Sequence, residues 1–246
     1  MSTKYKYTKQ ISVHNDNRNM SGGGKRYPEP NYFFAVRIYN KSIHQKMKEV
    51  QRYVKSRKPI LQECFTSPDK LHLTTFVMTL ADSGDIKKAI EAMHHSAPLI
   101  GNVLMTRSGE SLTLQLEFRN LKSFGGKVVF IDVVKNESLS VLKSINSIMK
   151  QSFRHVGLRY KGGSWTPHLT VMKMNKCVET MAEAGIHQIE SRFYRKYADC
   201  VFGNDTVNDI VLCSMDDDEL ESDGFYKIIA KIDLWNRENV SVSKNF

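Results

Sequence analysis

The stretch "DKLHLTTFVM", residues 69–78, places a histidine and a threonine two positions apart inside an apolar run. The stretch "TPHLTVMKM", residues 166–174, repeats this pattern, with its histidine 96 positions further along the chain (168 minus 72). Both runs have the length and composition of buried β-strands. Two matching H-L-T triplets in apolar strands have no obvious reason in packing, so they indicate one site built from two halves.

Each H-L-T triplet presents its two polar side chains on the same face, because successive side chains of a strand point in opposite directions. His72 and Thr74 therefore share one face of the first strand, and His168 and Thr170 share one face of the second. If the two strands lie close together, the space between them holds two imidazoles and two hydroxyls.

This set of groups suits the cleavage of a phosphodiester with no metal ion and no other cofactor. One neutral histidine can take the proton from an attacking hydroxyl while the other, protonated, delivers a proton to the leaving oxygen. The ordinary pKa of histidine is close to neutrality, so it serves both roles. The threonine hydroxyls can donate hydrogen bonds to the phosphate oxygens, where negative charge accumulates.

Two blander interpretations compete with this one for each histidine taken alone. A single histidine in a strand is more often a hydrogen-bonded core residue than a catalyst. A metal site would need more strong ligands, because hydroxyls are poor zinc ligands and no third strong ligand stands at a sequence spacing typical of zinc sites. The duplication of the triplet favours the catalytic interpretation for His72 and His168.

Length and composition are those of a globular protein with a basic surface. The chain has 246 residues, 41% of them hydrophobic, and its 36 Lys and Arg against 26 Asp and Glu give a formal net charge of +10. This balance favours a polyanionic partner such as a nucleic acid or a phosphorylated ligand. We find no apolar run long enough to span a bilayer and no secretory signal, so we expect a cytoplasmic protein, which can also be nuclear, with no membrane partner.

The four cysteines show no C-x-x-C spacing, which indicates neither a zinc cage nor a disulfide framework. The acidic stretch "DDDELESD", residues 216–223, does not fit the calcium-loop pattern, and we interpret it as a solvated turn.

One folded domain, residues 29–236, is expected between two tails. Residues 1–28 contain a glycine triplet and two basic clusters without apolar periodicity, which predicts a mobile basic tail, and residues 237–246 form a C-terminal tail.

Inside the domain, aromatic and β-branched runs alternate with segments of helical spacing. In the first half we expect, in order, a strand at 31–40, a helix at 41–58, strands at 60–65 and 71–80, and a helix at 82–97. In the second half we expect strands at 111–121 and 125–134, helices at 137–153 and 178–197, and strands at 206–215 and 224–235. The recurrence of strand, helix and histidine strand indicates a structural duplication.

The two triplets resemble the H-x-T motifs of the two-histidine (2H) phosphoesterase superfamily. Further segments resemble, in the same order, the nucleotide-binding central domain of A-kinase anchoring protein 7/18-type proteins. These segments are "PNYFFAVRI", "KLHLTTFVM", "LKSFGGKVVFIDV", "WTPHLTVMK" and "DTVNDIVLCSMDDDELESDGFYKI". The resemblance covers about residues 30–235.

The resemblance implies an α/β (α+β) bilobal fold with two pseudo-symmetric lobes of antiparallel sheet, helices outside and a central groove. It also implies binding of nucleoside monophosphates and, for several relatives, cleavage of 2′,5′-linked oligoadenylate. Carried over to this sequence, His72 and His168 become the acid and base pair, and Thr74 and Thr170 become the phosphate-binding hydroxyls. Both motifs are intact, which argues against a copy that only binds.

Anchoring of a kinase regulatory subunit would require an amphipathic docking helix, usually near the C-terminus of such a protein. The chain ends in "LWNRENVSVSKNF", which lacks helical apolar spacing. The sequence therefore argues against this partner for the chain as given, although a longer isoform could supply the helix.

The base of a bound nucleotide needs an aromatic ring or a guanidinium on which to stack. The candidates near the second motif are Arg159, Tyr160 and Trp165, and Phe202 could approach the same groove. A tryptophan just before a buried strand is about as often a lid on the core as a stacking platform.

The leading hypothesis is a monomeric, metal-independent phosphodiesterase that acts on 2′,5′-linked oligoadenylate or a related short RNA. One alternative is a non-catalytic module that binds AMP or CMP or serves as a scaffold. The other is an enzyme that acts on a 2′,3′-cyclic phosphate or on a 3′,5′-linked RNA end. The sequence does not separate these linkages.

Overall fold

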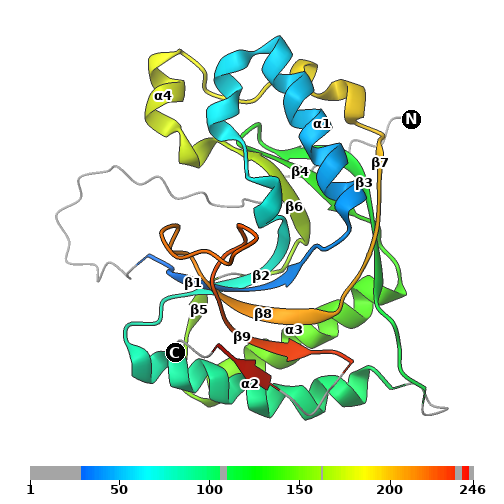
Figure 1. The fold of residues 1–246 in the computed structure, drawn as a ribbon, viewed down its shortest axis with the longest axis vertical. Coiled ribbons are helices and arrows are strands. Elements are labelled where there is room, and N and C mark those ends of the chain that lie inside the picture. Colours follow the sequence, from blue (N-terminus) through cyan, green and yellow to red (C-terminus); the bar gives the residue numbers. More distant parts are fainter. Residues whose placement is uncertain (1–28, 106–109, 162, 236–239, 244–246) are drawn as a thin grey trace, which may run out of the picture.

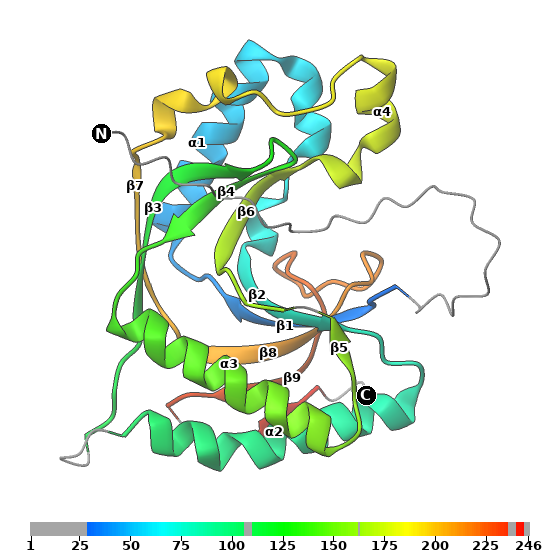
Figure 2. The same ribbon diagram turned by 180° about the vertical axis from the view of Figure 1, so that it is seen from behind.

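The computed structural model describes residues 29–105, 110–161, 163–235 and 240–243. The expected N-terminal tail, residues 1–28, lies outside the described residues. The described strands form two sheets in which all paired neighbours run antiparallel. The two sheets lie between two helical layers, which Figures 1 and 2 show from opposite sides.

The large sheet has six strands in the order β10-β9-β8-β1-β2-β5. Their bounds, in that order, are Val240–Val242, Ile228–Asp233, Asp209–Ser214, Tyr32–Arg37, His72–Met78 and Tyr160–Lys161. The small sheet has four strands in the order β6-β4-β3-β7. Their bounds are His168–Lys173, Val128–Val133, Gln115–Phe124 and Val201–Thr206. The two H-x-T triplets therefore begin β2 and β6, one in each sheet.

Each sheet carries its helices on one face only. Helices α2 (Ser83–Val103) and α3 (Glu137–His155) cover the large sheet, whereas α1 (Lys41–Arg57) and α4 (Val178–Glu183) lie over the small sheet (Figure 1). Phe153 of α3 packs edge-on against Phe34 and Phe76 of the large sheet, with ring centroids 4.9 and 5.4 Å apart. We call the two sheet faces that turn away from these helices the inner faces.

Most of the expected elements are confirmed, and each of the long helices α1, α2 and α3 begins with a capping side chain. Asn40, Asp82 and Asn136 accept a hydrogen bond from the first turn of α1, α2 and α3. Such caps satisfy backbone donors that the helix itself leaves unpaired. The fold is thus an α+β arrangement of two antiparallel sheets with helices.

Two expectations were wrong, each for a local reason. The strand expected at 60–65 is a 3-10 helix, η1 (Pro59–Cys64), because the proline favours a helical first turn. The helix expected at 178–197 ends at Glu183, since Gly185 adopts a left-handed φ of 65°. Two 3-10 turns follow it, η4 (Ser191–Phe193) and η5 (Arg195–Tyr197). Within the expected C-terminal tail, residues 240–242 pair with β9 as β10.

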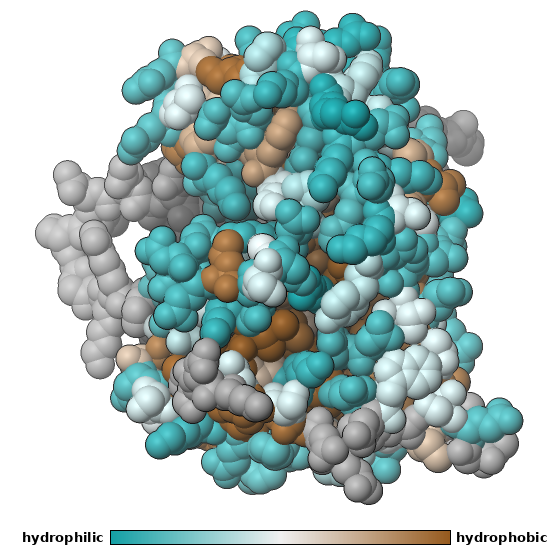
Figure 3. Space-filling view, in the orientation of Figure 1, coloured by the Kyte–Doolittle hydropathy of each residue, from teal (hydrophilic) through white to brown (hydrophobic). Residues whose placement is uncertain are grey.

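The described surface differs between the two halves. The small-sheet half is predominantly hydrophilic, and apolar residues gather lower in the same view, over the large sheet (Figure 3). Of the helices in the described residues, none is long and apolar enough to cross a bilayer.

Candidate functional site

The first H-x-T triplet lies on the inner face of the large sheet. His72 is paired across the strands with Arg37, and Thr74 with Ala35. The Nδ1 atom of His72 is 2.7 Å from the carbonyl oxygen of Lys70. A carbonyl only accepts, so Nδ1 carries the hydrogen and donates, and neutral His72 presents its lone pair at Nε2. The Thr74 hydroxyl, 2.9 Å away, donates to that lone pair.

The second triplet repeats this arrangement on the small sheet. His168 lies opposite Asp132 of β4, and Thr170 lies opposite Phe130. Nδ1 of His168 donates to the carbonyl of Thr166 at 2.8 Å. The carbonyl again belongs to the residue two positions earlier, so both motifs fix the same imidazole tautomer, with the lone pair of the neutral ring at Nε2.

Each triplet is followed by a β-bulge at the same offset. The register of β2 skips Thr75, and the register of β6 skips Val171, each three residues after its histidine. A bulge leaves one residue unpaired and reverses which side chains face inward beyond it. The buried residue after each bulge confirms this, because Phe76 and Met172 both enter the helix-side core. The two motif strands thus resemble each other in backbone geometry as well as in amino-acid sequence, which supports the duplication.

Strands β2 and β6 belong to different sheets but contact each other directly. Reciprocal bonds tie them together close to the bulges. The backbone N–H of Thr66 donates to the Val171 carbonyl at 3.1 Å, and the indole N–H of Trp165 donates to the Thr74 carbonyl at 2.7 Å. The buried amide of Gln51 in α1 donates to the carbonyls of Thr66 and Val171. The segment that precedes each motif is therefore fastened to the other motif.

Aromatic rings surround both imidazoles. The ring of His72 lies 4.9 Å from that of Phe33 and 5.4 Å from that of Tyr226, between centroids. The ring of His168 meets Phe124 at 5.1 Å and Phe130 at 5.3 Å, both edge to face. Phe124 and Phe130 themselves stack at 4.1 Å. These rings fix the orientation of the imidazoles and exclude water from their sides.

Burial dominates the protonation of both histidines. It lowers the pKa of His72 to about 4, and the positive charges of His168, Lys173 and Lys176 add to this shift. Burial also lowers the pKa of His168, helped by Lys173 and opposed by the neighbouring carboxylate of Asp132. The charge of His168 contributes to the shift of His72, and the strands that carry the two residues contact each other.

The acidic loop 216–223 is more than the solvated turn expected from the sequence. Asp217 pairs with Lys70 at 2.6 Å, and Asp223 pairs with Arg37. Both cations flank His72, since Lys70 provides its carbonyl partner and Arg37 is its neighbour across the strands. The loop lies next to the His72 half of the inner faces (Figure 1) and neutralises its cations.

One inner-face residue had not been predicted. Lys173 follows the bulge of β6, opposite Val128, and is half-buried. The signal in the sequence was a lysine within the second apolar run, but simple alternation does not place it on the face of His168. Only the bulge at Val171 turns it toward the inner face with His168 and Thr170.

Two of the predicted base-binding residues lie away from the two histidines. Tyr160 is paired with Met78 at the far end of β2. Its ring contacts Phe76 at 5.2 Å and lies near the cations of Lys150 and Arg154 on α3, which places it on the helix side of the large sheet. Arg159 is exposed immediately before it.

The other two candidates have different positions. Phe202 of β7 is fully buried in the helix-side core, so the expectation that it approaches the site was wrong. Trp165 is next to the first motif through its bond to the Thr74 carbonyl, and its half-buried ring also packs on the core. Of the four, only Trp165 has a hydrogen bond to a residue of an H-x-T triplet among the described residues.

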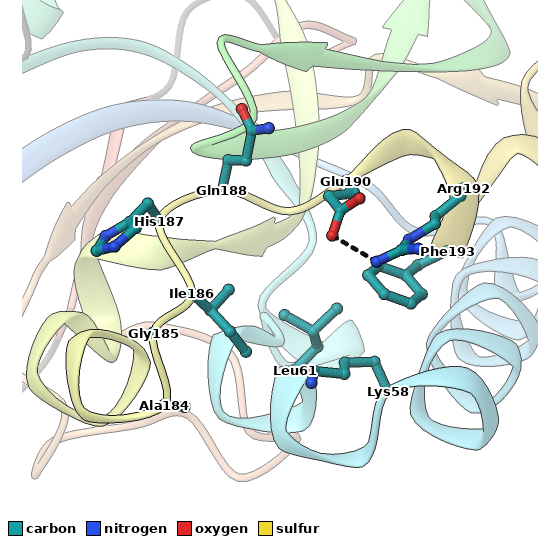
Figure 4. A pocket seen from close by; sticks show the side chains of 10 residues that line it. All are labelled: Lys58, Leu61, Ala184, Gly185, Ile186, His187, Gln188, Glu190, Arg192 and Phe193. Atoms are coloured by element: carbon teal, nitrogen blue, oxygen red, sulfur yellow. Dashed lines mark hydrogen bonds and ion pairs between the residues drawn. The ribbon is translucent and has the colours of Figure 1, made fainter.

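A pocket of about 400 Å³ opens elsewhere, on the outer side of the small-sheet half. Figure 4 shows its lining, which comes from Lys58 and η1 and from the chain after α4, where Glu190 and Arg192 of one segment are paired at 2.8 Å. None of the H-x-T residues lines it. Among the described residues, no group of three or more His, Cys, Asp or Glu side chains is placed to hold a metal ion.

Two antiparallel sheets, each contributing one H-x-T strand to a shared pair, define the class of two-histidine phosphoesterases. The chain belongs to the AKAP7 2′5′ RNA ligase-like domain family, whose family model matches residues 30–234. A curated relative, the human (Homo sapiens) A-kinase anchor protein 7 isoform gamma, is 29% identical over 199 residues. That match covers 80% of this chain and 55% of the relative, so the chain spans little more than half of its length.

Solved structures share the fold at low identity. A crystal structure of a phosphoesterase superposes with a TM-score of 0.51 and 14% identity, covering 82% of this chain and 97% of that one. A protein of Thermus thermophilus superposes with a TM-score of 0.53 and 15% identity, covering 83% of this chain and 97% of that one. Likeness at this level concerns the fold, and the chemistry must be argued from the residues.

Proposed function

We propose that the protein is a metal-independent phosphodiesterase that cleaves 2′,5′-linked oligoadenylate or a related short RNA by paired-histidine acid and base catalysis. The observation that carries this proposal is the matched pair of imidazoles. Both donate from Nδ1 to the carbonyl two residues earlier, on contacting strands, and both keep Nε2 directed away from the backbone. A histidine that only stabilises the core would not require a second histidine in the same arrangement.

In the proposed reaction the phosphate of a 2′,5′ linkage lies between the two triplets. Nε2 of His72 takes the proton from the vicinal ribose 3′-hydroxyl, whose oxygen attacks phosphorus. The bond from phosphorus to the 5′-oxygen breaks, and His168 delivers its proton to that oxygen. The products are a 2′,3′-cyclic phosphate and a free 5′-hydroxyl, and the two histidines end in exchanged protonation states.

The roles of base and acid follow from the surroundings. His72, with a pKa of about 4, is neutral at physiological pH and suits the base. His168 has a carboxylate neighbour, Asp132, which favours its charged form, and a bound phosphate adds a second negative charge beside it. His168 therefore suits the acid.

Nucleic acid is the substrate class that best fits the remaining features. The hydroxyls of Thr74 and Thr170 flank the histidines and can donate to phosphate oxygens as charge develops. Aromatic rings stand beside both histidines, and the formal charge of +10 attracts a polyanion. The proposal concerns the two-histidine domain only and leaves kinase anchoring aside.

The decisive experiment offers the protein 2′,5′-linked and 3′,5′-linked triadenylate in the presence of a strong chelator. We expect cleavage of the 2′,5′ compound, formation of a cyclic phosphate, and no cleavage when the attacking ribose carries a 3′-O-methyl group. Loss of activity in chelator, restored by a divalent ion, would contradict the metal-free mechanism.

The same assay distinguishes the competing functions. A binding module would bind AMP or CMP yet cleave neither triadenylate. Preference for the 3′,5′ compound or for a 2′,3′-cyclic phosphate would keep the histidine chemistry but change the substrate.

A further inference from the structure

Lys173 occupies a position on the inner face that the motif itself does not require. The bulge at Val171 turns it to the same side as His168 and Thr170. Its equivalent in the first triplet, five residues after His72, is Val77, which packs on the apolar inner-face cluster around Phe33. The strand and its bulge are therefore compatible with an apolar residue here, and the lysine needs another explanation.

Within the described residues, no carboxylate is paired with the ammonium of Lys173. The side chain is half-buried. The carboxylate of Asp217, which lies near Lys176, is already paired with Lys70 at 2.6 Å. Burial and the charge of Lys176 lower the pKa of Lys173.

A half-buried cation without a partner costs free energy that an anionic ligand would offset. The electrostatic environment points the same way, because the charge of Lys173 acts on both His72 and His168. Lys173 and Lys176 thus make the space beside the histidines attractive to an anion.

The strand register sets this position apart from the reacting phosphate. His168 lies opposite Asp132 and Lys173 lies opposite Val128, four residues apart on β4. At about 3.3 Å per residue, the two backbone positions are separated by roughly 13 Å. The backbone of Lys173 therefore lies further along β6 than that of His168, on the same face of the strand.

We propose that Lys173, assisted by Lys176, forms a second phosphate subsite, so that the preferred substrate is an oligonucleotide carrying a further phosphate, such as a 5′-phosphorylated 2′,5′-linked dinucleotide. This inference rests on the proposed function, because it places the first phosphate between the two H-x-T triplets. The corresponding position of the first strand, Val77, is apolar, so only the β6 side offers a second phosphate subsite. The substrate can therefore bind in one orientation only.

The test measures binding by calorimetry of two 2′,5′-linked diadenylates, one with and one without a 5′-phosphate. Both carry a 3′-O-methyl group on the attacking ribose, which prevents the proposed cleavage. The proteins are the parent, Lys173→Met, Lys173→Arg and Lys143→Met, the last removing an exposed lysine of α3 as a matched control. Thermal melts verify that each variant is folded.

We expect the parent to bind the phosphorylated compound about 10-fold more tightly, as one charge-assisted hydrogen bond provides. Lys173→Met should reduce this ratio to near one, whereas Lys173→Arg and Lys143→Met should retain it. Equal binding of both compounds by the parent, or an unchanged ratio in Lys173→Met, would overturn the subsite. If Lys173→Met melts far below the parent, Lys173→Val, which copies the first triplet, takes its place.

The result is separable from that of the proposed reaction. A parent protein that shows the binding preference but does not cleave the unblocked diadenylate retains the subsite and loses the catalytic function. A parent that cleaves but shows no preference retains the function and loses the subsite.

Discussion

The two histidine strands share one backbone design and differ in what surrounds it. In β2 and in β6 the triplet begins the strand, the histidine donates from Nδ1 to the carbonyl two residues earlier, and a bulge follows at the third position. The tautomer and the orientation of the imidazole are therefore set by local backbone geometry, which each copy of the motif carries with it.

The surroundings of the two imidazoles are not duplicated. His72 packs against Phe33 and Tyr226, and the cations next to it are neutralised by carboxylates of the loop 216–223. His168 lies beside Asp132, and a lysine without a carboxylate partner in the described residues shares its face. The comparison shows that sequence duplication can supply two identical imidazoles, whereas their neighbours make the pKa values of the two rings differ.

The largest expected effect comes from removing either imidazole. His72→Ala and His168→Ala should each lower the turnover of 2′,5′-linked triadenylate by about 100-fold to 10,000-fold, the usual contribution of a positioned proton-transfer group. The double variant should lose little more than either single variant, because the two act as one unit. Steady-state kinetics on purified proteins provides the measurement.

The matched control is His94→Ala, which removes an exposed histidine of α2. Its turnover should equal that of the parent, and all the variants should retain the circular dichroism of the parent. The base and acid assignment is wrong if both single variants keep the parental rate.

A second effect concerns stability, and His72 of β2 should contribute to it. The pKa of His72 is about 4 in the folded protein and about 6.5 in an unfolded chain, so the unfolded state binds more protons between these values. The free energy of unfolding should fall as the pH drops from about 6.5 to 4, by at most about 3 kcal/mol from this group.

Urea unfolding of the parent and of His72→Gln at pH 7 and pH 4.5 measures this contribution. Glutamine removes the titration, so the variant should lose less stability than the parent over the same interval. Equal losses in both proteins would show that His72 is not held neutral by its burial.

A smaller effect should follow from the two hydroxyls. Thr74→Val and Thr170→Val should each lower turnover by about 10-fold to 100-fold, because each removes one donor to the developing charge. Thr74→Val should also raise the pKa of His72, since its hydroxyl donates to Nε2 of the neutral ring. Histidine NMR titration checks this difference, and a shift of equal size in Thr170→Val would contradict it.

Alternation of side chains and spacing of helices were sufficient to predict the motif strands and the long helices. They place His72 with Thr74 and His168 with Thr170, because both pairs precede the bulges. Beyond a bulge, alternation fails, and this is why it does not place Lys173 on the inner face.

The remaining positions depended on contacts between distant segments. Trp165 is fixed by a carbonyl on β2, 91 positions away, and the acidic loop is fixed by cations from β1 and from the turn before β2. Phe202 is buried because β7 pairs with β3. The residues of β7 alone do not indicate this pairing. The periodicity of apolar residues within one segment does not indicate such pairings.

The most direct test of unequal protonation is the pH dependence of kcat/KM on 2′,5′-linked triadenylate, for the parent and for Asp132→Asn. The parent should give a bell-shaped profile whose acid limb lies near the His72 pKa of about 4. Its alkaline limb should lie below the ordinary histidine value, because burial lowers the pKa of His168, and both apparent values belong to the pair. Removing the carboxylate lowers the pKa of His168, so the alkaline limb alone should move to lower pH. A bell whose two limbs shift together, or whose alkaline limb stays in place, would contradict the assignment of His72 as base and His168 as acid.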